Sequence, residues 1–245
     1  GLVPQTQTDA QAIASLGLSH ELGDNVVLRA NVAQGYVYPS LLQFATGAYA
    51  ASRFVNPNPD LEPETAVSWE GGLRLRAAGW VFDTGVFRTA SEDYIDHVFC
   101  APIDGCLSAR DKVYVNIGEA TAQGLELYAA RAEGELRWRP YASLTWMKRE
   151  NRYENFVTED SGTPSLSGTL GLTWEPLFAA SMDGWLDLGL RGETASKREE
   201  PSSGGLSMRD EDDAWLTLNL SGGLQWGTAR RLGLGQRKRR LLAVA

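Results

Sequence analysis

The sequence predicts an all-β protein, an antiparallel transmembrane β-barrel fragment of about nine strands with short turns at one end and long loops at the other. Three observations lead to this fold class. Apolar and polar side chains alternate with period two in segment after segment, as in strands that face different environments on their two sides. No apolar run exceeds five residues, so a transmembrane helix is excluded. The connections between the segments alternate in length, which is typical of outer-membrane barrels.

The alternation is clearest at residues 66–77, where Val67, Trp69 and Leu73 share one face and Glu70 and Arg74 the other. A helix would need apolar spacings of three and four, which these segments do not show. Nine segments are predicted as strands by this criterion: residues 12–18, 26–34, 66–77, 80–89, 122–132, 136–146, 166–175, 186–191 and 216–221.

The connections fall into two classes by length. Short turns are predicted at residues 21–25, 78–79 and 133–135, with a slightly longer one at 177–184. Long polar loops are predicted at residues 39–65, 99–112, 150–164 and 196–213. Because strands run antiparallel, all short turns then lie at one end of the sheet and all long loops at the other.

The alternation alone fits either a soluble sheet, whose apolar side forms a core, or a barrel, whose apolar side meets lipid and whose polar side lines a lumen. Tryptophans near the strand ends favour the barrel, because their amphipathic rings suit the headgroup level of a membrane. The alternative is that they fill gaps in a core. These residues are Trp80, Trp138, Trp146, Trp174, Trp185, Trp215 and Trp226.

The net charge of −8 hides a basic C-terminus, because residues 227–245 carry six basic residues and no acidic one. The remainder is therefore strongly acidic, which disfavours nucleic acid as a partner. We divide the chain into a barrel part, residues 1–226, and a basic tail, residues 227–245, since the alternation stops near Trp226.

The two cysteines, Cys100 and Cys106, flank a turn that contains Pro102 and Gly105. In an oxidising compartment this arrangement predicts a disulfide. A metal site that includes His97 and a pair of free thiols are the alternatives. With no fourth ligand at a recognisable spacing, the sequence predicts no metal site and no cofactor.

Two motifs carry a family resemblance. The segment Asn58-Pro59-Asp60-Leu61-Glu62-Pro63-Glu64-Thr65 resembles the NPDLKPE box of TonB-dependent outer-membrane receptors. Tyr114-Val115-Asn116-Ile117-Gly118-Glu119-Ala120 with Gly124-Leu125-Glu126-Leu127 resembles the Y-x-N-I-x-x-A…G-x-E box of the same family, in the same order. The matching residues are Asn58, Pro59, Asp60, Leu61, Pro63, Glu64, Tyr114, Asn116, Ile117, Ala120, Gly124 and Glu126.

The resemblance implies a barrel of about 22 strands with a plugged lumen, in the outer membrane of a Gram-negative bacterium. It implies that the long loops capture a scarce nutrient such as an iron chelate. It also implies contact with outer-membrane lipid and with TonB, the latter through an N-terminal plug. We expect the plug and the early strands to be missing from this chain. The family ends on an amphipathic strand with a terminal aromatic residue, so we expect the tail to be truncated or frame-shifted. A solvated basic extension is the alternative.

The loop at residues 39–65 and its approach supply candidate ligand-binding residues. Aromatic and arginine side chains suit an anionic, partly aromatic chelate by stacking and by paired hydrogen bonds. They could equally pack the loop against its neighbours. No histidine lies between Tyr38 and Asn58, so the sequence does not support haem ligation by this loop. The candidates are Tyr36, Tyr38, Phe44, Tyr49, Arg53 and Phe54.

An enzyme is the rival class, and the sequence argues against it. Carboxylates at Glu70, Asp83, Glu126 and Asp187 all lie on the polar face, but no spacing brings two of them to the separation that glycoside hydrolysis needs. No Gly-x-Ser-x-Gly elbow occurs. A passive porin or an adhesin shares the barrel and is the remaining alternative to an iron-chelate receptor.

Overall fold

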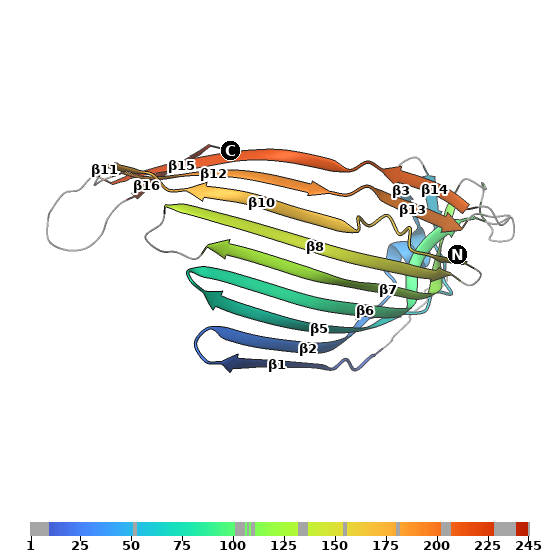
Figure 1. Ribbon diagram of the computed structural model, residues 1–245. Helices are drawn as coiled ribbons and strands as arrows, with labels where there is room; N and C mark the ends of the chain where they lie inside the picture. Colours follow the sequence, from blue (N-terminus) through green and yellow to red (C-terminus); the bar gives the residue numbers. More distant parts are fainter. Residues whose placement is uncertain are drawn as a thin grey trace.

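The computed structural model describes residues 10–50, 53–100, 106, 108, 111–131, 137–153, 156–179, 182–201, 207–227 and 239–244. Figure 1 shows long strands that lie side by side in one curved sheet. The hairpin turns of β1–β2 and β5–β6 lie at one end of the sheet, and β3, β13 and β14 lie at the other. The sheet is open, since β1 pairs only with β2 and β16 only with β15.

Ten strands form the main path of the sheet, and each pairs antiparallel with the next. The first nine correspond in order to the nine predicted segments. The tenth, β16, lies inside the predicted basic tail and pairs with β15, so strand pairing continues beyond Trp226. The strands are β1 (Ser15–Leu22), β2 (Val26–Val37), β5 (Glu64–Ala77), β6 (Trp80–Phe99), β7 (Lys112–Arg131), β8 (Trp138–Tyr153), β10 (Leu166–Trp174), β12 (Met182–Glu193), β15 (Trp215–Gly227) and β16 (Arg239–Val244).

Shorter elements lie at both ends of the sheet. The five-residue π-helical turn η1 (Leu42–Thr46), β3 (Ala48–Ala50) and β4 (Arg53–Asn56) belong to the first long loop; β9 (Phe156–Thr158) pairs with β8; β11 (Leu177–Ala179) pairs with β12; and β13 (Ser196–Pro201) pairs with β14 (Ser207–Asp212). Within the described residues, no helix is long and apolar enough to cross a membrane.

The strand register sorts the side chains onto two faces. Trp69 lies opposite Val32 and Arg88, whereas its neighbour Glu70 lies opposite Asn31 and Phe87. Directly opposed residues of an antiparallel pair share a face. In the same way Leu127 lies opposite Leu144, and Glu126 lies opposite Thr145. The predicted alternation of these strands is therefore confirmed.

One face carries almost only apolar side chains, although they are exposed. A soluble sheet would bury such a face, whereas a membrane barrel turns it to lipid. The polar face then lines the lumen. Exposed large residues on the apolar face include Leu28, Val32, Val67, Trp69, Leu73, Phe82, Val86, Leu127, Leu144, Trp146, Leu170, Leu186, Leu188, Leu190, Leu216, Leu218 and Leu220.

Four of the predicted girdle tryptophans lie on the apolar face: Trp80, Trp138, Trp146 and Trp174. The Trp138 and Trp174 rings stack with centroids 5.3 Å apart at the short-turn end. For Trp185 and Trp215 the predicted position in the aromatic girdle was wrong.

Trp185 precedes Leu186 and therefore lies on the opposite, polar face, and Trp215 lies there too, opposite Glu193. The guanidinium of Arg191 lies 5.8 Å from the centre of the Trp215 ring. The position of a residue along a strand sets only its height in the membrane, whereas its odd or even place in the strand sets the face on which its side chain lies. These two rings therefore lie on the lumen side. The side chain of Trp226 lies outside the described part of the chain.

Glycines on the polar face make room for rings that lie flat on the lumen wall. Tyr141 crosses Gly171 and Gly189 and donates a hydrogen bond to Asp187 Oδ1 at 2.9 Å. The Thr173 hydroxyl donates to the other carboxylate oxygen of Asp187 at 2.6 Å. Since a side chain on either glycine would meet Tyr141, this arrangement joins the three strands β8, β10 and β12.

A second polar cross-link joins three strands. Asp83 on β6 accepts hydrogen bonds from Arg29 on β2 and Arg74 on β5, each at 2.6 Å. Opposite charges that pair in this way can face a polar lumen without repulsion. The lumen wall is thus held by side chains as well as by the backbone ladder.

We predict that Gly171→Ala destabilises the full-length barrel by about 1–3 kcal/mol, because the new methyl group displaces Tyr141 and breaks its hydrogen bond to Asp187. Tyr141→Phe should cost about 1 kcal/mol through the lost hydrogen bond alone. Urea unfolding of the protein in lipid vesicles measures both. Gly85→Ala is the matched control, since the nearest atom to its new Cβ is 3.8 Å away. An equal effect of Gly85→Ala would contradict the packing argument.

Candidate functional site

The candidate site lies where β6 and β7 project beyond the membrane. Each of these strands has 20 residues. That corresponds to about 66 Å at 3.3 Å per residue, whereas roughly 10 residues suffice to cross the hydrocarbon core. The apolar face ends near Trp69 and Trp146, so the parts of β6 and β7 beyond that level are held above the membrane.

Asn116, from the second motif, binds the first motif through its side chain. Its Nδ2 atom donates to the carbonyl oxygens of Glu62 at 2.8 Å and Asp93 at 2.7 Å. Its Oδ1 atom accepts from the Glu62 N–H at 2.8 Å. One asparagine thus saturates both backbone groups of Glu62, and the two motifs that are 54 residues apart in the chain touch directly.

Two asparagines in or next to the first motif donate hydrogen bonds to the backbone of β7. Asn58 Nδ2 donates to the Tyr114 carbonyl and Asn56 Nδ2 to the Lys112 carbonyl, both at 3.0 Å. Beside them, β4 pairs parallel with the start of β7. We call Asn56, Asn58 and Asn116 with these partners the motif clasp.

The clasp covers an edge that the sheet leaves open. Strand β8 pairs with β7 only from Glu119 onward, so residues 112–118 of β7 have β6 on one side and no long strand on the other. An open edge exposes unpaired N–H and C=O groups and invites faulty pairing. The segment from Val55 to Glu62 occupies that edge, pairs with the start of β7 and supplies donors to the carbonyls of Lys112 and Tyr114.

The clasp also encloses the compact apolar core of the described chain. Leu61 of the first motif is 4% exposed and Ile117 of the second is 3% exposed. All buried hydrophobic residues among those described lie at this end, and none lies in the membrane belt. They are Val55, Leu61, Ile95, Phe99, Cys100, Val113, Ile117, Ala120 and Tyr153.

The remaining motif residues have structural positions as well. The Asp60 N–H donates to Asn58 Oδ1 at 2.9 Å within the turn at Pro59. Gly124 lies beneath the Phe87 ring, whose Cζ would be 2.7 Å from an added Cβ. Glu126 lies on the lumen face, and Ala120 lies opposite Ser91 and Asn151. Tyr114 places its ring 6.4 Å from that of His97, and Pro63 leads directly into β5.

A charged cluster lies on the lumen side just below the clasp. Glu64 opens β5 five residues before Trp69, near which the apolar face ends, so it lies outside the membrane belt. Burial raises the pKa of the Glu64 carboxyl, while hydrogen bonds from the Ile95 backbone and Ser91 and the charge of Arg149 oppose the rise. The Arg149 guanidinium also lies 5.0 Å from the centre of the Tyr94 ring.

A cation–aromatic platform forms beside the clasp from Tyr49, Arg53, Phe54, Phe99 and Lys112. The Arg53 guanidinium lies 4.9 Å and the Lys112 ammonium 5.0 Å from the centre of the Phe99 ring. The Tyr49 and Phe54 rings, cross-strand partners in the β3–β4 hairpin, have centroids 5.1 Å apart. Tyr49 is 79% exposed, whereas Arg53 and Lys112 are half-buried, so the platform presents one open ring beside two partly exposed cations.

The structure brings three of the six predicted ligand residues together, namely Tyr49, Arg53 and Phe54. Tyr36 lies opposite Thr65 on the face shared with Val32, so its register turns it away from the lumen. Tyr38 follows the end of β2 and is exposed. Phe44 belongs to η1 and is half-buried.

Phe99 and Lys112 were missed at the sequence level. They flank the loop that carries Cys100 and Cys106, and the structure joins these cysteines with an S–S distance of 2.06 Å. The disulfide holds the end of β6, and Cys100 N–H donates to the Asp111 carbonyl beside the start of β7. The signal in the sequence was their position, since Phe99 and Lys112 are the first and last residues of the predicted loop at residues 99–112. Their meeting with Arg53 depends on the parallel β4–β7 pairing, which has no local signature.

We predict that Asn116→Ala opens the clasp. It removes two exposed hydrogen bonds to Glu62 and one part-buried hydrogen bond to Asp93, each worth about 0.5–1.5 kcal/mol. Hydrogen exchange followed by mass spectrometry should then show faster exchange in residues 55–62 and 112–118 of the full-length receptor. Asn219→Ala is the control, because its side chain makes one exposed 3.4 Å contact with Thr217. Unchanged protection in Asn116→Ala would rule out the clasp.

Comparison with known proteins agrees with this architecture. The family model "TonB dependent receptor-like, beta-barrel" matches residues 4–236. The ferrienterobactin receptor of Escherichia coli strain K12 is 28% identical over 123 residues, which cover 46% of this chain and 16% of that protein. The ferric enterobactin receptor of Pseudomonas aeruginosa strain PAO1 is 28% identical over 183 residues, which cover 66% of this chain and 24% of that protein. The chain therefore spans a quarter or less of these relatives.

Solved structures share the fold. A copper transporter superposes with a TM-score of 0.62 at 15% identity, covering 89% of this chain and 31% of the other. A ferric enterobactin receptor of Pseudomonas aeruginosa gives a TM-score of 0.61 at 20% identity, covering 89% and 33%. At such identities the likeness concerns the fold. Together with the family match over nearly its whole length, the observed barrel sheet and its two interlocked motifs show that this chain belongs to the family of TonB-dependent receptors, as part of their β-barrel.

Proposed function

We propose that the full-length protein is an outer-membrane receptor that imports an anionic iron chelate with energy supplied through TonB. Membership of the family supports the transport role and the outer-membrane location. The names of the relatives, receptors for ferric enterobactin, support an iron chelate as cargo. We propose TonB as a partner through an N-terminal plug, and outer-membrane lipid as the surrounding medium.

The platform is the observation that carries the choice of ligand. Arg53 and Lys112 place two positive charges over one ring at the long-loop end, in a chain whose net charge is −8. Guanidinium and ammonium groups bind anionic oxygens, and exposed rings stack on flat aromatic groups. Tyr49 and Phe54 add the ring surface beside the cations. An anionic chelate built from aromatic donors satisfies both features together.

The lumen face supports passage of a polar cargo rather than catalysis. The side chains there engage one another across strands, as Asp83 does with Arg29 and Arg74 and Asp187 with Tyr141. These carboxylates hold the wall of the barrel. We therefore propose that the chain is no enzyme and that its charged residues stabilise and line a transport path.

We predict that the double variant Arg53→Ala/Lys112→Ala lowers the affinity of the full-length receptor for ferric enterobactin by about tenfold or more, since each charge-assisted contact is worth about 1.5–3 kcal/mol. Quenching of tryptophan fluorescence by the ferric chelate measures the affinity. Lys197→Gln is the control, because this loop-end lysine pairs with Glu211 at 3.2 Å away from the platform. Unchanged affinity in the double variant would reject the platform as the ligand site.

Uptake of radiolabelled iron by whole cells tests the transport role separately. We expect uptake of the chelate to require TonB and to fall in the double variant, while cobalamin and haem are not taken up. Uptake that continues unchanged without TonB would instead favour a passive porin. Binding of cells to a surface without any uptake would favour an adhesin.

A further inference from the structure

Three segments of the chain meet at the cation–aromatic platform, and one side chain joins all three. Asn56, the last residue of β4, donates from its Nδ2 atom to the Lys112 carbonyl of β7 at 3.0 Å. The same Nδ2 atom lies 3.6 Å from Cys100 Sγ, directly after the end of β6, and makes a weak hydrogen bond to the sulfur. The Asn56 amide therefore connects β4 to the ends of both strands that carry Phe99 and Lys112.

Each cation of the platform is close to a backbone position that these contacts fix. Arg53 precedes Asn56 by three residues on the short strand β4. Lys112 is the register partner of Val55 on β4 and of Phe99 on β6. A shift of β4, or of the end of β6, would therefore move a cation relative to the ring.

The platform needs such a restraint because its two cations repel each other. The Arg53 guanidinium and the Lys112 ammonium lie 4.9 Å and 5.0 Å from the same ring centre, so the two charges are close neighbours. Like charges this close repel. The Phe99 ring is 7% exposed and acts as a spacer between the cations. Its own place has to be held by the chain around it.

The Cys100–Cys106 disulfide supplies the covalent part of this restraint. It lies within the connection that leads from Phe99 to Lys112, and it closes part of that connection into a ring. Such a ring excludes conformations that the open connection would otherwise adopt. Cys100 is fully buried, at 0% exposure, beside Asn56. Its sulfur is therefore held by the amide as well as by the covalent bond.

We propose that the Asn56 amide and the disulfide are positioning elements, which hold the two cations of the platform at the spacing that binds an anionic ligand. Affinity for the ligand then depends on the disulfide being intact, without contact between the sulfurs and the ligand. The inference rests on the proposed function for the identity of the ligand. The placement of the two cations, in contrast, is measured without any ligand.

The test compares Asn56→Leu and Cys106→Ser with the wild-type full-length receptor in detergent. Asn56→Leu keeps the size of the side chain and removes its donor, whereas Cys106→Ser breaks the covalent bond and leaves the Cys100 sulfur in place. The first measurement is the acetylation rate of Lys112 by an amine-reactive ester, followed by mass spectrometry without ligand. We expect Lys112 to react about threefold faster in both variants, because the rate follows the fraction of time in which the ammonium is exposed. Lys197, on the β13–β14 hairpin, is the internal reference.

The second measurement is the affinity for ferric enterobactin. Asn56→Leu and Cys106→Ser should each weaken binding about tenfold, the value of one charge-assisted contact. In the Arg53→Ala/Lys112→Ala background the same substitutions should have almost no further effect, because a positioning residue acts only through the groups that it positions. A merely structural loss would instead add to the loss in the double variant.

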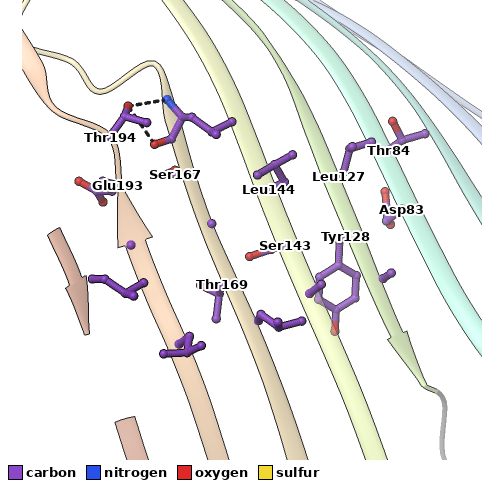
Figure 2. Close-up of a pocket in the computed structure, with 18 of the residues that line it drawn as sticks. Asp83, Thr84, Leu127, Tyr128, Ser143, Leu144, Ser167, Thr169, Glu193 and Thr194 are labelled. Atoms are coloured by element: carbon purple, nitrogen blue, oxygen red, sulfur yellow. Dashed lines mark hydrogen bonds between the residues drawn. The ribbon is translucent and has the colours of Figure 1, made fainter. Parts of the chain in front are cut away.

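Thr194→Val is the matched control. The Thr194 hydroxyl also joins two strands, because it donates to the Leu166 carbonyl at 3.3 Å and accepts from the Leu166 N–H at 3.2 Å (Figure 2). These contacts lie beside an apolar hollow of about 870 Å³ over Gly168 and Gly192 on the membrane face, in a different part of the sheet from the platform. Both measurements should therefore give wild-type values in Thr194→Val.

Wild-type labelling of Lys112 in both Asn56→Leu and Cys106→Ser would overturn the proposal. Equal changes in Thr194→Val would overturn it too, as would losses of affinity that add fully to the loss in the double variant. Faster labelling of Lys112, in a receptor whose wild type does not bind ferric enterobactin, would support the positioning role and reject the proposed ligand. The two hypotheses therefore fail separately.

Discussion

The antiparallel register of the long strands is the constraint on which the rest of this structure depends. In hydrocarbon every backbone N–H and C=O needs a partner inside the protein, so the ladder has to be continuous through the membrane. Once the ladder is continuous, parity decides the face of every side chain. Trp69 then meets lipid and Glu70 the lumen, and the same rule places Trp185 and Trp215 inside although they resemble girdle residues.

Above the membrane the constraint changes, because both faces of a strand can meet water or other protein. Alternation is then no longer required, and β6 and β7 continue to Phe99 and from Lys112 without it. Order there comes from side chains instead. The asparagines of the clasp supply the hydrogen bonds that a neighbouring strand would otherwise make, and Leu61 and Ile117 form a core beneath them.

This division assigns the motif residues and the proposed ligand residues to different tasks. The motif residues hold the first long loop against β7 and so place β4 beside the disulfide-bonded end of β6. Arg53, Phe99 and Lys112 come together as a consequence. A rigid base under a loop lowers the entropy lost when the loop orders around a ligand. The motif therefore supports the proposed capture of ligand without contact with it.

The sequence by itself determined the class of fold, the nine long strands and their faces, because a period of two is a local property of the chain. It also identified both motifs and three platform residues, Tyr49, Arg53 and Phe54. Only the tertiary structure decided that Asn116 binds Glu62, that Arg53 and Lys112 both contact the Phe99 ring, and that β16 adds a tenth strand. These depend on pairings between distant segments, and the hollow over Gly168 and Gly192 likewise depends on which strands are neighbours. No short-range pattern encodes such partners, since their free energy arises only when the sheet has formed.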